Sequence, residues 1–211
     1  MQSIREFTHM PTSADTKLAA PGAGLPFPEL LIARSRFTLK CWTGDRDSFV
    51  ANFQEERDKI GDLIASIPES QRGEQRLIKR LRGMEDSSRD WSVWMTLDHL
   101  RITNSAFAHS ILLLSKGKTP NVIASTAAVK PDPAVTVRIE DKFQKSCDAF
   151  LKLVEKAGDL KTEVRHTHPW FGPLDAFRWL ALASMHMGIH RAQIAAIIDA
   201  RPSLKGYPIP R

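Results

Sequence analysis

The chain has 211 residues, which is enough for one domain of about 100–200 residues with some margin at the ends. Hydrophobic residues make up 42% of the sequence and charged residues 26%, a composition that is typical of a soluble globule and excludes a disordered chain. The formal net charge of +6 can attract anionic ligands, but without a recognition motif it does not indicate a nucleic-acid-binding protein.

Cysteine content and the absence of a leader point to the cytoplasm. Cys41 and Cys147 are too few for a disulfide framework or a structural zinc site, which indicates a reducing compartment. The first 27 residues hold charges and three prolines but no apolar core of signal-peptide length. No run of about 18 uncharged apolar residues occurs in the sequence. We therefore expect a cytoplasmic protein that does not enter a membrane.

The chain divides into three expected segments. Residues 1–27 lack hydrophobic periodicity and are predicted to form an extended or mobile arm. Residues 28–200 are predicted to form a single helical domain, and residues 201–211 a Pro-containing C-terminal tail.

The first predicted helices follow Pro28, a residue that suits the first position of a helix. A short helix is expected over residues 30–41, and the sequence Thr43-Gly44-Asp45 interrupts it. Apolar residues then recur at near-heptad spacing until Pro68 and predict the first long core helix; they are Phe49, Phe53, Ile60, Ile64 and Ile67.

Basic residues are concentrated after this helix, at Arg72, Arg76, Lys79, Arg80 and Arg82. We interpret the run as a solvated connecting helix. The alternative is an anion site for a phosphate or for a thiol that carries a carboxylate. Nucleic acid is not expected as a partner, because no series of stacking aromatic residues accompanies the run.

Three more long helices are predicted. Ser92 suits the N-cap of a helix that ends before Gly117, a natural left-handed residue. Residues 118–133 are rich in Pro, Thr and Ala and predict a long crossover loop. A third helix is expected over residues 139–157 and a fourth over residues 174–200. The predicted fold class is all-α: an antiparallel four-helix bundle with a long crossover loop and an N-terminal helical extension.

Two histidines lie four residues apart on the core face of the fourth bundle helix. At about 100° per residue, His186 and His190 fall near the centre of an apolar stripe. Their Cβ atoms are then about 5–6 Å apart, so two ring nitrogens can reach one cation at about 2.0–2.1 Å. His99, at the edge of the core stripe of the second bundle helix, is the candidate third ligand, whereas His109 lies well off that stripe.

Three neutral imidazoles on facing helices would leave coordination positions for water or substrate, as in catalytic metal sites. The alternative is that each is an ordinary core histidine with its own hydrogen bond. Leaving such groups unpaired costs about 1–3 kcal/mol each, so three inward-facing histidines favour a shared cation. With an ordinary imidazole pKa near 6.5, we expect metal binding to weaken below about pH 6.

Several segments between about residues 45 and 200 resemble the DinB/YfiT-like superfamily. They include Asp98-His99-Leu100, His168-Pro169-Trp170-Phe171-Gly172-Pro173-Leu174 and His186-Met187-Gly188-Ile189-His190-Arg191-Ala192-Gln193-Ile194. The resemblance implies a four-helix bundle that holds a divalent metal ion, nickel or zinc among others. Its ligands would be one histidine of the second helix and two of the fourth, here His99, His186 and His190. Many relatives end the motif in His-His, whereas this chain has Ile189-His190.

The resemblance implies more than one activity. Some members are thiol-dependent transferases or isomerases that use mycothiol, bacillithiol or glutathione, and others resemble metal-dependent hydrolases. We expect a metal-dependent enzyme in which the ion activates water or a low-molecular-weight thiol for attack on a small-molecule substrate. The alternative is a non-catalytic bundle that binds metal or a hydrophobic ligand and acts through oligomerisation, for example as a homodimer. The sequence identifies no catalytic residue.

Three further residues are candidates for the surroundings of the site. Gln193 lies one turn beyond His190 and could fix the tautomer of a ligand imidazole. His168 could reach the mouth of the site, although its Pro- and Gly-rich neighbours favour a turn that sets the entry of the helix. Trp94 could line a pocket or serve as a packing anchor. Asp98 is expected to be solvated or at an interface, because adjacent residues on a helix point about 100° apart.

Overall fold

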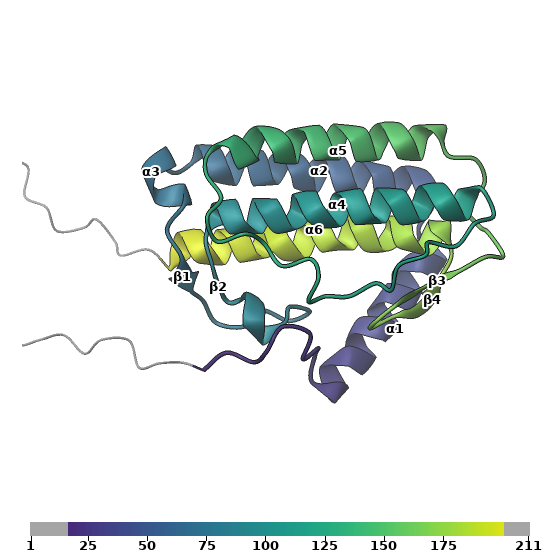
Figure 1. Ribbon diagram of the computed structural model, residues 1–211, viewed down its shortest axis with the longest axis horizontal. Helices are drawn as coiled ribbons and strands as arrows, with labels where there is room; N and C mark the ends of the chain where they lie inside the picture. Colours follow the sequence, from purple (N-terminus) through teal and green to yellow (C-terminus); the bar gives the residue numbers. More distant parts are fainter. Residues whose placement is uncertain (1–16, 201–211) are drawn as a thin grey trace, which may run out of the picture.

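The computed structural model describes residues 17–200, and its main body is a bundle of four long helices. These are α2 (Arg46–Ala65), α4 (Val93–Ser115), α5 (Arg138–Lys156) and α6 (Ala176–Asp199), as Figure 1 shows. The predicted four-helix bundle is therefore confirmed. The helical extension is α1 (Phe27–Thr43), which packs against α6 at one end of the bundle. Within the described residues, no helix is long and apolar enough to span a bilayer.

The contacts between helices define their directions. Trp94 and Asn104 of α4 contact Glu140 and Cys147 of α5 in the same order, so these two helices run parallel. Contacts between α4 and α6 occur in opposite order along the two helices, which are therefore antiparallel. Contacts between α2 and α6 occur in the same order, so this pair is parallel. Two consecutive helices can run parallel because residues 118–137 carry the chain back along the bundle (Figure 1). The long crossover loop is thus the feature that sets the topology. The expected antiparallel arrangement holds for α4 with α6 but not for the neighbouring pairs α4 with α5 and α2 with α6, which run parallel.

Side-chain caps explain where the bundle helices begin. Asp45 accepts a hydrogen bond from the backbone N–H of Ser48 in a capping box at the start of α2. Ser92 and Asp175 accept from the third residues of α4 and α6 in the same way. Such caps contribute about 1 kcal/mol each. At the other end of α4, Gly117 has a φ of 69°, a left-handed conformation that glycine adopts without strain.

Aromatic pairs fill the core between the helices. Phe53 of α2 stacks on Phe150 of α5 with 4.5 Å between ring centroids. Phe37 contacts Phe171 at 4.6 Å and anchors α1 on the segment before α6. Cys147 is fully buried in α5 and behaves as a small apolar side chain.

The segment between α2 and α4 is not the connecting helix that its basic residues predicted. It contains only α3 (Glu69–Arg72), the 3-10 helix η1 (Asp86–Ser88) and a short antiparallel pair, β1 (Arg76–Leu77) with β2 (Asp90–Trp91). Three of its arginines form ion pairs: Arg72 with Glu140, Arg76 with Glu74, and Arg80 with Glu29. These pairs reduce the charge with which the run could hold an anion, whereas Lys79 and Arg82 are exposed.

A second antiparallel pair lies before α6, in a region predicted to be a turn. It joins β3 (His166–His168) to β4 (Gly172–Leu174), with His168 opposite Gly172. Gly172 has a φ of 73°, which permits the reversal of the chain. Strands of two or three residues are too short to show a sequence period, which is why the sequence did not predict them.

A buried carboxylate joins three loops on one side of the bundle. Glu85 is 4% exposed and accepts hydrogen bonds from Lys130 at 2.9 Å, Thr126 at 2.8 Å and the backbone N–H of Gly22 at 3.3 Å. Burial alone would raise the pKa of Glu85, but the bonds from Lys130 and Thr126 outweigh it and lower the pKa. Part of the predicted N-terminal arm, from residue 17 onward, is thus held on the domain. Residues 1–16 and 201–211 lie outside the described residues.

Replacing Glu85 with alanine should lower the free energy of unfolding by about 3 kcal/mol, because it leaves the ammonium group of Lys130 with two serine hydroxyls but no carboxylate partner. Glu55→Ala is the matched control, since this exposed carboxylate pairs only across one turn of α2. The control should leave the midpoint of urea unfolding, followed by circular dichroism, almost unchanged. Equal losses in both variants would contradict a structural role for the Glu85 contacts.

Candidate metal centre

Three histidine side chains meet inside the bundle, one from α4 and two from α6. The Nε2 atom of His186 lies 3.2 Å from that of His99 and 3.1 Å from that of His190. His99 and His190 are buried, whereas His186 is only partly so. One nitrogen of each ring lies within 4.8 Å of the corresponding atoms of the other two, a grouping that fits a single metal ion. A cation about 2.0–2.1 Å from each nitrogen would hold them at roughly this spacing.

Hydrogen bonds fix the tautomers of two of these rings. The Nδ1 atom of His99 lies 2.7 Å from the carbonyl oxygen of Val129, and because a carbonyl only accepts, this nitrogen carries the proton. The Nδ1 atom of His190 lies 2.7 Å from Oε1 of Gln193. Gln193 donates its own amide to the carbonyl of Ser88 at 2.7 Å, which orients the amide so that its oxygen faces His190. Both rings therefore present an unprotonated Nε2 to the cluster.

The third ring cannot satisfy both of the others. A neutral His186 can donate from Nε2 to only one of the two facing lone pairs. In the described part of the chain its buried Nδ1 atom has no hydrogen-bond partner. When all three rings are neutral, the Nε2 of His186 therefore faces at least one other Nε2 with a lone pair on each nitrogen. A cation between the three nitrogens removes this repulsion, so the donor set fits a metal ion.

Burial keeps all three imidazoles neutral. It lowers the pKa of His99 to about 4, against an ordinary value of 6.5. The pKa values of His186 and His190 are also lowered well below 6.5, first by burial and then by the neighbouring histidines. At neutral pH the three rings are therefore ready to bind a cation without losing protons.

Aromatic side chains enclose the cluster. The indole of Trp91 stacks on His190 with ring centroids 6.2 Å apart and lies 5.2 Å from His99. Phe107 meets His186 edge-on at 5.4 Å. Apolar walls on these sides lower the local polarity and strengthen the electrostatic interactions inside the site.

The other candidate residues are placed differently. Gln193 contacts His190 as described above. His168 lies on β3, where its Nδ1 accepts from the backbone N–H of Trp170 at 3.1 Å, and burial lowers its pKa to about 4. Its ring lies 5.6 Å from that of Trp179, which contacts Phe107, the aromatic neighbour of His186. The indole N–H of Trp94 instead donates to Glu140 at 2.7 Å, a contact between α4 and α5.

Asp98 was expected to be solvated or at an interface, and the first of these alternatives is wrong. Its carboxylate is buried and accepts from the backbone N–H of Asp132 at 3.0 Å and from Arg101 at 2.9 Å. The helical direction of Asp98 does differ from that of His99, as expected, but the crossover loop covers that side of α4. Asp98 and His99 thus hold neighbouring parts of the same loop.

Three contributors to the site were missed from the sequence. Val129 and Ser88 contribute their backbone carbonyls, a role that any residue type can fill and that the sequence therefore does not indicate. Trp91 belongs, with Ser92, to the segments that carry the family resemblance, but it lies outside any helical period and so received no place at the site from the sequence.

Comparison with known proteins places these residues in a family. The family model described as the DinB superfamily matches residues 52–194, which include the three histidines and Gln193. The chain belongs to the DinB superfamily. The DinB match leaves α1 outside its limits.

One solved structure supports the fold of this DinB protein. TT2238, described as a four-helix bundle protein, is similar over 72% of this chain and 99% of its own chain. The TM-score is 0.54 and the sequence identity 17%, so the likeness concerns the fold alone. No curated protein matches the chain at a significant level.

Alanine at His99, His186 or His190 should each remove most of the metal bound by the DinB protein, because two histidines hold an exchangeable cation poorly. His109→Ala is the matched control, since this histidine of α4 is exposed. The measurement is the metal-to-protein ratio of each variant and of the parent, obtained by elemental analysis after loading with zinc or nickel near neutral pH. Full occupancy in the His99 variant, or loss in the His109 variant, would contradict the ligand set.

Metal retention should extend to lower pH than the ordinary imidazole pKa indicates. Protons compete for a ligand only below its pKa in the folded protein, and that of His99 is about 4. Occupancy measured by equilibrium dialysis should therefore stay constant from neutral pH to well below 6.5 and fall as the pH approaches 4. Circular dichroism at each pH shows whether the protein is still folded. Metal loss centred near 6.5 from folded protein would contradict the lowered pKa values.

Proposed function

We propose that this DinB protein is a metal-dependent enzyme that holds one divalent ion, nickel or zinc, on His99, His186 and His190. The reaction is attack of a water or a thiolate on a small electrophilic substrate. The observation that supports it is the meeting of three Nε2 atoms, two of them on rings held as Nδ1–H tautomers.

The number and charge of the ligands favour catalysis over a structural site. A divalent ion on three neutral imidazoles keeps its double charge and an open position, and can lower the pKa of a bound water or thiol. His186 is the most exposed of the three ligands, so a substrate reaches the site from its side. Val129 and Gln193 hold the other two rings in place while this exchange occurs.

The nucleophile comes from outside the protein. Burial raises the pKa of the Cys41 thiol to about 11 and that of Cys147 to about 12. Both thiols are therefore protonated at neutral pH. They are the two cysteines of the chain, so thiolate chemistry requires a low-molecular-weight thiol, and hydrolysis requires water.

His168 is suited to interact with the substrate as a hydrogen-bond donor. Its Nδ1 accepts from the backbone of Trp170, so in the neutral ring the proton is on Nε2. With a pKa of about 4 the ring stays neutral at physiological pH. A neutral Nε2–H can donate to a carbonyl or to a leaving group without adding a positive charge beside the ion.

Turnover of electrophilic model substrates tests the proposal. Zinc- or nickel-loaded protein is assayed with glutathione, mycothiol or bacillithiol, and with water alone, and compared with His186→Ala and the control His109→Ala. Thiol-dependent turnover supports a transferase and thiol-independent turnover a hydrolase; in both cases His186→Ala should lose activity and His109→Ala keep it. Metal binding without any turnover would favour the non-catalytic bundle. Equal activity in the His186→Ala protein would contradict the site.

A further inference from the structure

Helix α1 is apolar on two faces, and only one of them is covered. Phe37 is 4% exposed and packs on Phe171, which anchors the inner face. The outer face carries five large apolar side chains that are between 46% and 84% exposed: Phe27, Leu31, Ile32, Leu39 and Trp42. Exposure of two aromatic and three aliphatic side chains on one helix needs an explanation, since single exposed residues are normal but a contiguous set is not.

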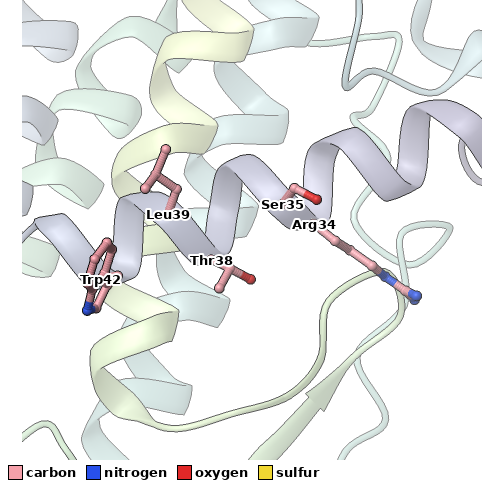
Figure 2. Close-up of a pocket in the computed structure, with 5 residues that line it drawn as sticks. All are labelled: Arg34, Ser35, Thr38, Leu39 and Trp42. Carbon is pink, nitrogen blue, oxygen red and sulfur yellow. The ribbon is translucent and has the colours of Figure 1, made fainter.

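These side chains form a single stripe along the helix. At about 100° per residue they lie, together with Ser35 and Thr38, in an uncharged sector of roughly 140°. Figure 2 shows part of this stripe, with Ser35, Thr38 and Trp42 on consecutive turns of α1 and Leu39 beside Thr38. A shallow pocket follows it from Arg34 to Trp42. We call this set the α1 stripe.

Basic residues border the α1 stripe on both sides. Arg34, whose Nε donates to the carbonyl of Trp170 at 2.6 Å and whose terminal nitrogens carry the rest of the charge, lies on one border, and Arg36 and Lys40 lie on the other. The single acidic residue of α1 is Glu29, which is engaged by Arg80 and by the backbone N–H of Gly83 at 2.6 Å. A second copy of the chain packed on the stripe would place its own basic residues beside those of the first copy, and the like charges would repel. An anionic surface would instead attract the basic residues on both borders.

We propose that the α1 stripe docks this protein on the surface of an anionic phospholipid bilayer. Its apolar side chains enter the boundary between headgroups and acyl chains, and Arg34, Arg36 and Lys40 contact the lipid phosphates. A helix that lies in the membrane interface has this pattern of Trp, Phe and Leu on one face with Arg and Lys beside it. The stripe lies outside the residues matched by the DinB family, and its role is independent of the metal chemistry.

The geometry gives a peripheral and reversible attachment. Within residues 17–200 no helix is long and apolar enough to span a bilayer, so the proposed contact is made by the α1 stripe at the surface. The proposal departs from the sequence-based expectation of no membrane contact, which considered spanning segments and not an amphipathic helix. Each basic residue near an anionic surface contributes about 1 kcal/mol, or roughly a fivefold change in binding, and salt weakens this term. Apolar insertion supplies the remaining affinity, and it is insensitive to salt.

Co-sedimentation of the full-length, metal-loaded protein with vesicles tests the proposal. The vesicles are phosphatidylcholine alone or phosphatidylcholine with roughly a third phosphatidylserine, at low and high salt. We expect the parent protein to bind the anionic vesicles. The double variant Leu31→Ser/Trp42→Ser should bind them at least tenfold more weakly. The double variant Arg36→Glu/Lys40→Glu should weaken it by about 25-fold or more, from about 1 kcal/mol per residue.

The matched control is Val122→Ser/Ile123→Ser, which removes two apolar side chains that are 64% and 94% exposed on the crossover loop. It should bind vesicles as the parent does. Circular dichroism and retained metal show that each variant is folded. Absence of vesicle binding, or equal binding of the Leu31→Ser/Trp42→Ser variant, would overturn the proposal. A concentration-dependent dimer that this variant loses, with no vesicle binding, would assign the stripe to a second copy instead.

Discussion

The hydrogen bond between His99 and the carbonyl of Val129 determines what the centre of the bundle can do. It selects the tautomer of His99 and so decides that Nε2, the nitrogen facing α6, carries a lone pair. The loop that supplies this carbonyl is itself held by two buried carboxylates, Asp98 and Glu85, through Asp132 and Lys130. An irregular segment therefore fixes the chemistry of a ligand on a regular helix. The site depends on the crossover loop as much as on the helices.

Helical periodicity explains which parts of the site could be predicted. In a helix, residue number fixes direction, so the positions of His99, His186 and His190 on core faces followed from their spacing. The same rule gave the direction of Asp98 correctly but not its environment, because the covering loop has no period. The roles of the backbone carbonyls of Val129 and Ser88 could not be predicted either, because both residues lie in segments without a helical period. The four bundle helices and the N-terminal helix could be predicted from chain-breaking residues, whereas the parallel pairing of α4 with α5 required knowing where the crossover loop runs.

Burying three imidazoles beside one another works against stability, and the surrounding structure compensates for it. Desolvation and mutual repulsion lower their pKa values, which keeps the rings neutral but leaves the Nδ1 of His186 without a partner. The compensation lies in well-packed contacts elsewhere, such as the Phe53–Phe150 stack and the capped starts of α2, α4 and α6. A local departure from good hydrogen bonding of this kind is expected where a site is built for binding and not for folding.

The separation of the ligands along the chain gives the centre a further property. His186 and His190 are one helical turn apart, so α6 alone can present them, but His99 lies 87 residues before His186. An isolated helix or a partly folded chain thus offers two nitrogens, and the third arrives only when α4 has docked with its loop in place. If the three histidines bind one cation, its affinity would rise when the bundle is assembled, and the ion would act as a removable cross-link that distinguishes the finished bundle from its folding intermediates.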